Sequence, residues 1–271
     1  MTRNQALKDA VQFVQDYDEY LLVSHVHPDG DTISSTLAMA YVLKKLGKTF
    51  VIINQDPIPD RFLFLPMADL FYSANQVNHS FSHVITLDAA DRKRIGDIEH
   101  LFTENVKILN IDHHPTNDYF GDINVVVPHA AATAEVMYDF VQEIGIEMDK
   151  DLASMIYTGL LTDTGGFRYT NTSSKVLRIA AQLLEFGISP GEIAEMALET
   201  ISLTHLMILK KAFEHVELLE QGRVAWTVLR LTDLKDLSTA SDDTEGVVNY
   251  MRNIEGVEVG VFFKEADTEA F

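Results

Sequence analysis

The sequence predicts an α/β protein with a parallel-sheet N-terminal domain and a smaller α+β C-terminal domain. Short apolar runs typical of buried strands alternate with segments of helical apolar spacing through most of the chain. Several of the apolar runs end directly in Asp or His residues. After about residue 203 the pattern changes to strand-like runs joined by a short turn, which indicates a second domain.

The elements of the first domain follow from apolar spacing and from residues that end helices. Residues 3–17 have the apolar period of a helix, and the run Tyr20–Val23 is short and apolar, as in a buried strand. A helix over 32–46 is closed by Gly47. Further strands are expected at 50–53, 83–87 and 107–111, and further helices at 130–144, 152–162, 173–186 and 188–197.

The C-terminal part predicts a helix, a hairpin, a second helix and a last strand, at residues 206–214, 216–231, 246–254 and 257–264. Gln221 and Gly222 form the hairpin turn. We expect a catalytic domain at 1–187, a linker at 188–205 and a partial substrate-binding domain at 206–271, whose sheet is truncated at the last residue.

Composition excludes several classes of protein. The 271 residues include no Cys, so disulfides, thiolate nucleophiles and Cys metal sites are excluded. The formal net charge of −20 argues against a surface that binds duplex DNA through many phosphates. No stretch approaches the ~20 apolar residues of a membrane span, and the N-terminus has no apolar signal core, so we expect no membrane partner and a cytoplasmic location.

The segment Ser24–Asp31 carries three side chains of the metal-binding type directly after an apolar run. His25, Asp29 and Asp31 stand at spacings of four and two residues, so a strand-to-helix turn can bring them together. Carboxylates a few ångströms apart raise one another's pKa unless a cation is present. A divalent metal site is one reading; helix-capping aspartates and a core histidine are the alternative.

Three further positions repeat this arrangement. Asp88 follows the apolar run 83–87, and the triplet Asp112–His114 follows 107–111. Asp163 precedes Gly165 and Gly166, although it is also compatible with a simple turn. Because the carboxyl ends of parallel strands share one edge of a sheet, the four segments together predict one divalent metal site there.

Four motifs carry a family resemblance: HVHPDGD at 25–31, LDAAD at 87–91, IDHHP at 111–115 and TDTGGF at 162–167. They resemble, in order and spacing, motifs I to IV of the DHH phosphoesterase superfamily. That superfamily includes RecJ exonucleases, manganese pyrophosphatases and the NrnA-like nanoRNases and pAp phosphatases. Residues 245–265 resemble the first half of the DHH-associated domain, which favours the NrnA-like branch.

The resemblance implies a centre of two Mn²⁺ ions, with Mg²⁺ or Co²⁺ as substitutes. One ion would be held by His25, Asp29 and Asp88. The second would share Asp88 and have three further ligands, namely Asp31, His113 and Asp163. Carboxylate oxygens with a little imidazole suit such hard octahedral ions.

The resemblance also implies roles outside the metal ligands. Asp112 would orient a histidine, and His114 would face the substrate phosphate. Arg94 and Arg168 are candidates for phosphate contacts, although surface arginines are common. His27 is not expected to be a ligand.

The implied activity is Mn²⁺-dependent hydrolysis of short RNA oligonucleotides (nanoRNA) to mononucleotides and of 3′-phosphoadenosine 5′-phosphate (pAp) to AMP. A phosphodiesterase for cyclic or linear dinucleotides and a RecJ-like single-strand exonuclease are alternatives within the superfamily. The acidic chain, with one Trp, lacks the cationic track and stacking platform of the latter. A non-catalytic nucleotide- or metal-binding module is the alternative outside enzymes. Apolar surface on the partial domain suggests self-association as a homodimer.

Overall fold

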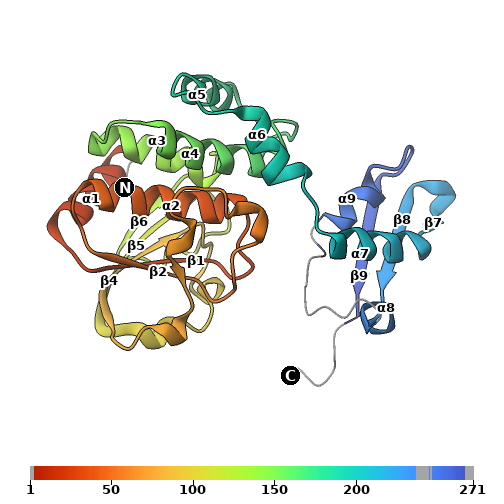
Figure 1. The fold of residues 1–271 in the computed structure, drawn as a ribbon, viewed down its shortest axis with the longest axis horizontal. Coiled ribbons are helices and arrows are strands. Elements are labelled where there is room, and N and C mark those ends of the chain that lie inside the picture. The colour runs from red at the N-terminus through yellow and green to blue at the C-terminus, as the bar shows by residue number, and fades with distance from the viewer. Residues whose placement is uncertain (1–2, 236–243, 245, 266–271) are drawn as a thin grey trace. The chain divides into compact units, whose positions relative to one another are not determined.

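The computed structural model describes residues 3–235, 244 and 246–265. The chain divides into two units, Met1–Thr200 and Ile201–Phe271, and the elements of each are labelled in Figure 1. The predicted domain limits at residues 187 and 206 stay a prediction.

A six-stranded sheet forms the centre of the first unit. Its strands pair in the order β3-β2-β1-β4-β5-β6, and every pairing is parallel. Their bounds are Tyr20–Ser24 (β1), Phe50–Ile53 (β2), Phe71–Tyr72 (β3), Phe81–Leu87 (β4), Phe102–Asp112 (β5) and Ile123–Val126 (β6). The predicted α/β class with a parallel sheet is therefore confirmed. The sequence did not predict β3 and β6, because two and four residues give too little periodicity to recognise.

Alternate residues of the central strand pack into two different cores. Tyr20 and Leu22 of β1 belong to the core on the helical side, whereas Leu21 and Val23 belong to the core on the other side. Because both faces are covered, all five residues of β1 are buried, which is why the strand appears in the sequence as a continuous apolar run.

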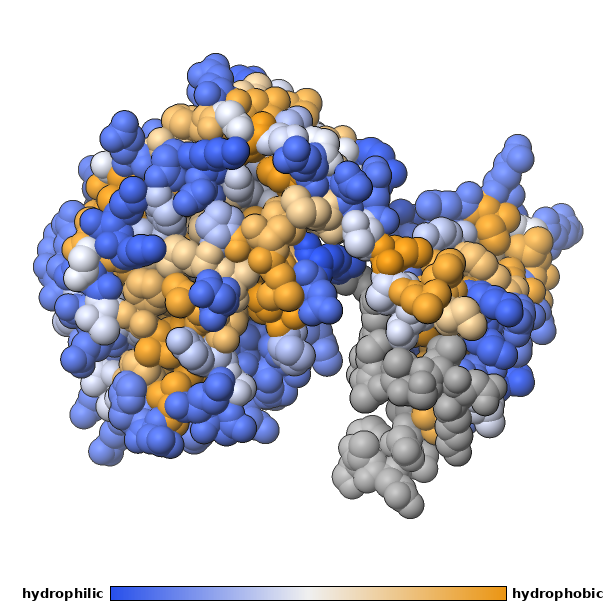
Figure 2. All heavy atoms as spheres, in the orientation of Figure 1, coloured by the Kyte–Doolittle hydropathy of each residue, from blue (hydrophilic) through white to orange (hydrophobic). Residues whose placement is uncertain are grey.

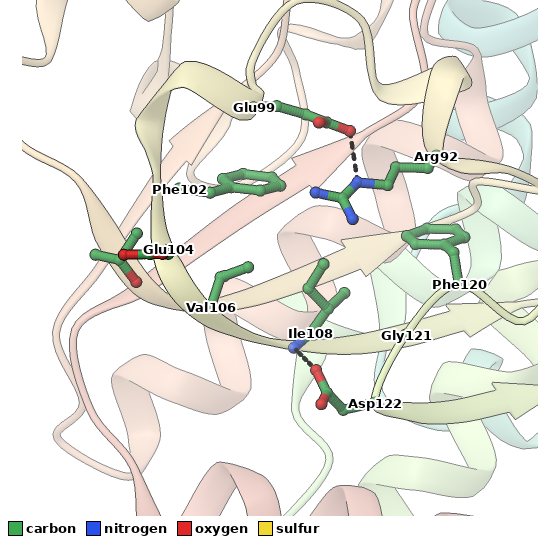
Figure 3. A pocket seen from close by; sticks show the side chains of 10 residues that line it. Arg92, Glu99, Phe102, Glu104, Val106, Ile108, Phe120, Gly121 and Asp122 are labelled. Carbon is green, nitrogen blue, oxygen red and sulfur yellow. Dashed lines mark hydrogen bonds and ion pairs between the residues drawn. The ribbon is translucent and has the colours of Figure 1, made fainter.

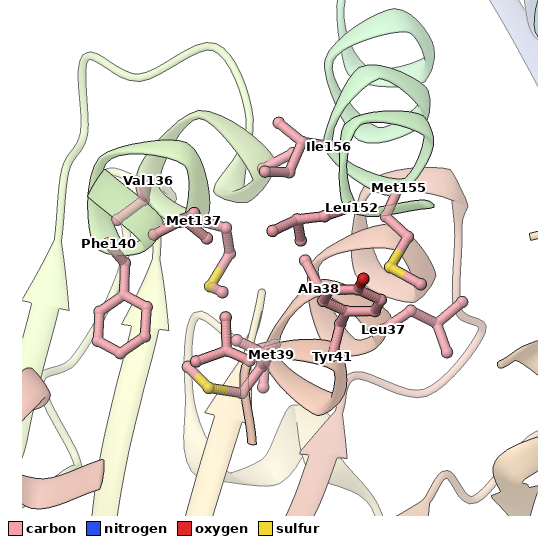
Figure 4. Packing of buried hydrophobic residues seen from close by; sticks show 14 of the residues in the cluster. Leu37, Ala38, Met39, Tyr41, Val136, Met137, Phe140, Leu152, Met155 and Ile156 are labelled. Atoms are coloured by element: carbon pink, nitrogen blue, oxygen red, sulfur yellow. The ribbon is translucent and has the colours of Figure 1, made fainter. Parts of the chain in front are cut away.

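Helices cover one face of the sheet, as Figure 1 shows. They are α1 (Arg3–Asp16), α2 (Gly30–Lys45), α3 (Thr133–Ile144) and α4 (Lys150–Asp163). In Figure 4, Leu37 and Met39 of α2 lie among apolar side chains of α3 and α4, such as Met137 and Leu152. Residues 30–43 of α2 are all buried, so this helix is fixed on every side and its N-terminus is held rigidly at the sheet edge.

The predicted helix limits are confirmed to within a few residues. Helix α3 was predicted from residue 130 but begins at Thr133, because Ala132 is extended and serves as the N-cap. Two more helices complete the unit, α5 (Ser174–Leu184) and α6 (Pro190–Ala194), and α6 continues into a π-helical segment, Glu195–Glu199.

The second unit is built on a three-stranded sheet in the order β7-β8-β9. Its elements are α7 (Leu203–Glu214), β7 (Glu217–Leu219), β8 (Val224–Leu229), α8 (Leu231–Lys235), α9 (Val247–Arg252) and β9 (Val259–Lys264). The pair β7–β8 is the expected antiparallel hairpin, and β8–β9 is parallel. The second strand was predicted to run to residue 231, which is wrong. The chain turns after Leu229, where the Asp233 carboxylate accepts the Arg230 N–H at 2.9 Å.

Apolar side chains are exposed on this second unit, where orange residues reach the surface in Figure 2. Four of them lie on its strands: Leu218, Leu219, Val259 and Phe263. Among the described residues, no helix combines the length and apolar character that crossing a bilayer requires.

Candidate metal centre

The centre lies where the strand order changes direction. From β1 the chain goes to β2 on one side, whereas β4 and then β5 lie on the other side. Ligands of open α/β sheets bind at this switch point, outside the carboxyl ends of the strands. His25 follows β1, Asp88 follows β4, and β5 ends at Asp112, so the fold brings the predicted motifs together at one edge.

The first motif is shaped by the start of α2. Asp29 is its N-cap, and Asp29 Oδ1 accepts the Thr32 backbone N–H at 3.0 Å. His27 has a left-handed φ of 54°, and its backbone N–H is held by Asp56 Oδ2 at 2.7 Å. The His27 side chain is 81% exposed and belongs to none of the potential ligand groups among the described residues.

One ligand group consists of His25, Asp29 and Asp88. His25 Nε2 is 3.4 Å from Asp88 Oδ2 and 3.9 Å from Asp29 Oδ2. His25 Nδ1 is 2.6 Å from the Val26 carbonyl oxygen, which can only accept, so the hydrogen of the neutral ring is on Nδ1. Burial lowers the pKa of His25, but Asp88 and Asp29 raise it above its usual value, so in the metal-free chain Nε2 can also carry a hydrogen. In the neutral ring, the form that can bind a metal, the lone pair of Nε2 faces the two carboxylates.

A second group consists of Asp31, His113 and Asp163. His113 Nε2 is 3.9 Å from Asp31 Oδ2 and 3.6 Å from Asp163 Oδ2. It is also 3.7 Å from Asp88 Oδ1. The two oxygens of Asp88 thus face different histidines, one in each of these two groups.

Asp88 is held at this position from several sides. Its φ of 58° lies in the left-handed region, which Asp and Asn tolerate better than most residues. Thr32 Oγ1 and Thr133 Oγ1 donate to its two oxygens at 2.7 and 2.8 Å. Burial alone would raise the pKa of Asp88, but the hydrogen bond with His25 and the charges of His25, His113 and His114 lower that pKa to about 2.

The other buried carboxylates are shifted in the opposite direction. Burial and the charges of Asp88, Asp163 and Asp29 raise the pKa of Asp31 well above its usual range. The pKa of Asp163 is raised to about 6, mainly by burial. The charge of His113 opposes this shift, and the charges of Asp88 and Asp29 add to it. In the metal-free chain, burial and the repulsion among neighbouring acids therefore disfavour the ionised forms of Asp31 and Asp163.

A divalent cation fits this donor set. Each ligand group offers nitrogen and carboxylate oxygen atoms within 4.8 Å of one another. Positive charge would remove the repulsion among the carboxylates, and the neutral rings of His25 and His113 would present Nε2 lone pairs to the cation. Oxygen-rich sets with some imidazole suit Mg²⁺, Mn²⁺ and related ions.

His114 belongs to a third ligand group, with Asp88 and His113, and it also pairs with Asp112. His114 Nδ1 is 2.7 Å from Asp112 Oδ1, and Asn117 Nδ2 donates to Asp112 Oδ2 at 2.7 Å. The hydrogen bond to Asp112 raises the pKa of His114 to about 9, with burial and the charge of Arg94 opposing the shift. The His114 imidazolium is therefore favoured across the neutral range.

The two predicted arginines are placed differently. Arg94 is exposed, its charge acts on His114, and its carbonyl oxygen accepts the Val26 N–H at 2.7 Å. Arg168 is also exposed. Its Nε donates at 2.6 Å to the carbonyl oxygen of Gly165, a residue two positions after Asp163. Among the described residues, neither guanidinium forms an ion pair with the candidate ligand carboxylates, so phosphate binding by them stays a prediction.

Sequence reasoning missed several residues that hold the ligands. Asn171 Nδ2 donates to the Asp163 and Ala131 carbonyls at 3.0 and 3.1 Å. His113 Nδ1 lies 3.2 Å from the Ala130 carbonyl oxygen, and Thr133 contacts Asp88. Residues 130–133 lie far from the four motifs in the sequence, and their composition carries no metal-binding signal.

A hollow of about 520 Å³ lies elsewhere on the first unit, and Figure 3 shows its lining. Phe102, Val106 and Phe120 form its apolar part, beside the Arg92–Glu99 ion pair. None of the predicted site residues lines it, so the acidic and imidazole cluster is the candidate site on chemical grounds.

Comparison with known proteins gives a consistent result. The DHH family, N-terminal domain, matches residues 19–160. A protein of Thermus thermophilus named "Bifunctional oligoribonuclease and PAP phosphatase NrnA" is 32% identical over 247 residues, covering 91% of this chain and 72% of that protein. A protein of the same name from Bacillus subtilis is 27% identical over 272 residues, covering 96% of this chain and 82% of that protein.

Solved structures agree with these matches. An exopolyphosphatase-related protein from Bacteroides fragilis has a TM-score of 0.89 at 25% identity, covering 98% of this chain and 81% of that chain. A putative family II inorganic pyrophosphatase from Methanococcus jannaschii shares the fold, with a TM-score of 0.52 at 19% identity over 90% of this chain and 82% of that chain. The residues matched by the family and the identity with the Thermus protein show that this chain belongs to the DHH family.

Proposed function

We propose that this chain is a Mn²⁺-dependent phosphoesterase that hydrolyses short RNA oligonucleotides to mononucleotides and pAp to AMP. Two lines support the proposal. The ligand groups at the switch point provide for two divalent ions, and the relatives of 32% and 27% identity are named for these two activities. The observation that carries it is the position of Asp88, whose Oδ2 faces His25 and whose Oδ1 faces His113.

Two cations held by these ligands would neutralise the phosphate and lower the pKa of a water for in-line attack. The water oxygen bonds to phosphorus, the bond from phosphorus to the departing ribose oxygen breaks, and that oxygen takes up a proton. The His114 imidazolium is the candidate donor of that proton. Asp112 accepts from Nδ1, so Nε2–H is the ring atom left for the substrate.

Both substrates are explained by one reaction. In an RNA oligonucleotide the leaving group is a nucleoside oxygen, and in pAp it is the 3′ oxygen of AMP, so the same attack on phosphorus serves both. The chain carries a formal charge of −20, so the substrate phosphate must be met by cations and by local residues such as Arg94 and Arg168. A small substrate satisfies that requirement more easily than a long polyanion.

The test is hydrolysis of 5′-labelled RNA oligonucleotides, from dimer to decamer, with pAp in parallel and Mn²⁺ varied. We expect rapid release of mononucleotides from the shortest oligonucleotides. Asp88→Asn is the inactive variant of choice, because Asn tolerates the left-handed φ of residue 88 and removes only the charge. Its rate should fall about a thousandfold or more.

Asp118→Asn is the matched control, since Asp118 is an exposed carboxylate close in sequence to the His114 segment. It should act like the unmodified enzyme. Mn²⁺-dependent turnover in Asp88→Asn at a near-normal rate would contradict the two-metal proposal. Tight nucleotide binding with no turnover at any Mn²⁺ concentration would instead support the non-catalytic binding module.

The same assay separates the alternative enzymes. With cyclic dinucleotides added to the series, hydrolysis of these or of the linear dimer, but not of trimers to pentamers or pAp, would support the dinucleotide phosphodiesterase. Faster hydrolysis of the decamer than of the dimer would support RecJ-like activity. Mg²⁺ and Co²⁺ should replace Mn²⁺ with lower activity. A homodimer and a cytoplasmic location remain parts of the proposal, checked by sedimentation and by cell fractionation.

A further inference from the structure

The hydroxyl of Thr32 lies inside the first ligand group. Thr32 Oγ1 is 2.5 Å from His25 Nε2 and 2.7 Å from Asp88 Oδ2. It is also 2.9 Å from Asp29 Oδ1. Thr32 is fully buried, with 0% of its surface exposed, so water does not compete for these contacts. One hydroxyl thus touches every member of the group that the motifs assign to the first ion.

The hydrogens available do not satisfy these contacts. The two carboxylates only accept, and His25 Nε2 presents a lone pair because the ring hydrogen is on Nδ1, toward the Val26 carbonyl. The hydroxyl has one hydrogen for three acceptors. Even with a second proton on the ring, one carboxylate contact would lack a hydrogen. A cation resolves the conflict, because each of the four groups has a lone pair to give to it.

Helix capping does not explain the position of the hydroxyl. The backbone N–H of Thr32 already donates to Asp29, so the cap of α2 does not need the side chain. Other threonines in this chain use their hydroxyls in the ordinary helical way: Thr36, Thr158 and Thr162 donate to the carbonyl four residues earlier. Thr32 is oriented toward the ligand group instead.

We propose that Thr32 Oγ1 is a further protein ligand of the cation held by His25, Asp29 and Asp88. The inference rests on the metal centre of the proposed function and adds a neutral oxygen to the ligand set that the motifs imply. A fourth protein donor, beside water and substrate, favours ions with six oxygen and nitrogen ligands over tetrahedral Zn²⁺. The hydroxyl hydrogen remains free to donate to one of the two carboxylates.

The first test is Mn²⁺ binding by calorimetry on the full chain, with no substrate present. Thr32→Val keeps the shape and the capping N–H but removes the oxygen, so one of the two binding events should weaken about tenfold or more. Thr32→Ser should bind like the unmodified chain. Thr36→Val is the matched control on the same helix, and both of its binding events should be unchanged.

The second test distinguishes a ligand from a mere neighbour. The natural sequence has no Cys, so Thr32→Cys introduces a single thiol. With Co²⁺, a thiolate bound to the ion gives a near-ultraviolet charge-transfer band, which Thr36→Cys should not give. This test also decides the matter if Thr32→Val does not fold.

Two results would overturn the proposal: unchanged affinities in Thr32→Val, or Co²⁺ binding to Thr32→Cys without the band. Absence of Mn²⁺ binding in the unmodified chain would overturn it as well. Absence of RNA and pAp hydrolysis, with two Mn²⁺ still bound, would contradict the proposed function alone.

Discussion

Asp31 and Thr133 are 102 residues apart in the sequence, yet Asp31 Oδ2 accepts the backbone N–H of Thr133 at 2.6 Å. Asp31 Oδ1 accepts the next N–H, that of Ala134, at 2.9 Å. The carboxylate therefore meets the free N–H groups in the first turn of α3, where the helix dipole favours negative charge. This contact joins the first motif to a helix that carries none of the four motifs.

Asp31→Asn should weaken metal binding and also destabilise the metal-free protein. An amide has one acceptor oxygen, so one of the two N–H groups of α3 loses its partner, at a cost of about 1–3 kcal/mol. Burial and the neighbouring acids raise the pKa of Asp31, so the measurement is made at mildly acidic pH, where repulsion among the carboxylates is smallest. Urea unfolding in EDTA measures the effect. Glu104→Gln, on an exposed residue, is the control, and an equal or greater stability of Asp31→Asn would contradict the expectation.

Asp163→Asn should lose metal affinity but stabilise the metal-free protein. Its carboxylate lies near the other acids, and its folded pKa of about 6 exceeds the ordinary value, so the ionised form is disfavoured by folding. The metal-free protein should therefore lose stability as the pH rises from about 4 through about 6, and the variant should not. At neutral pH we expect its melting temperature in EDTA to be higher by a few degrees. A lower melting temperature would show that Asp163 has a stabilising contact that outweighs the repulsion.

Gly159→Ala should destabilise the protein, although alanine is the better helix former. Gly159 is inside α4, and an added Cβ would lie 2.5 Å from Ala134 Cβ and 2.8 Å from Asp31 Oδ1. These neighbours are buried and fixed, so we expect a loss of about 1–3 kcal/mol together with weaker metal binding. Gly191→Ala is the control, because a Cβ there meets nothing within 4 Å in the helix α6, and it should be neutral or slightly stabilising. Equal effects of the two substitutions in chemical unfolding would argue against this packing explanation.

Asp112→Asn should shift the alkaline limb of the pH–rate profile to lower pH. The pKa of His114 is raised to about 9, mainly by its hydrogen bond with Asp112. A raised histidine pKa means that the imidazolium stabilises the fold below about pH 6.5, and that this contribution is lost as the pH rises through about 9. If the imidazolium is the proton donor, the rate falls over the same range. The amide removes the charge, so the limb should move by about one to two pH units.

The comparison for this prediction is between two enzymes, each saturated with Mn²⁺. Bound cations lower the pKa of His114 in both, so the difference between the profiles is the quantity to measure. Asp118→Asn should leave the limb in place. An unchanged limb in Asp112→Asn would remove His114 from the role of proton donor.

Local features of the sequence were sufficient for most of the fold and for which acidic and imidazole residues meet at the sheet edge. Continuous apolar runs such as Tyr20–Val23 predicted buried parallel strands, because a strand covered on both faces needs apolar side chains at every position. The Asp and His residues that end those runs predicted a metal site, since parallel strands deliver their carboxyl ends to one edge. Local signals were too weak for β3 and for β6, which are held by pairing with neighbours rather than by their own pattern.

Only the tertiary structure decided how the ligands are held and which atoms face one another. Contacts between distant segments place one oxygen of Asp88 near His25 and the other near His113. Such contacts also hold Asp31 at the N-terminus of α3 and the Thr32 hydroxyl at Asp88. These contacts follow from the packing of α2 against α3 and α4. The apolar pattern of a helix shows which face is buried but does not show which other segment covers it. The sequence thus determined which chemical groups are present at the sheet edge, whereas the close-packed core determined their distances and directions.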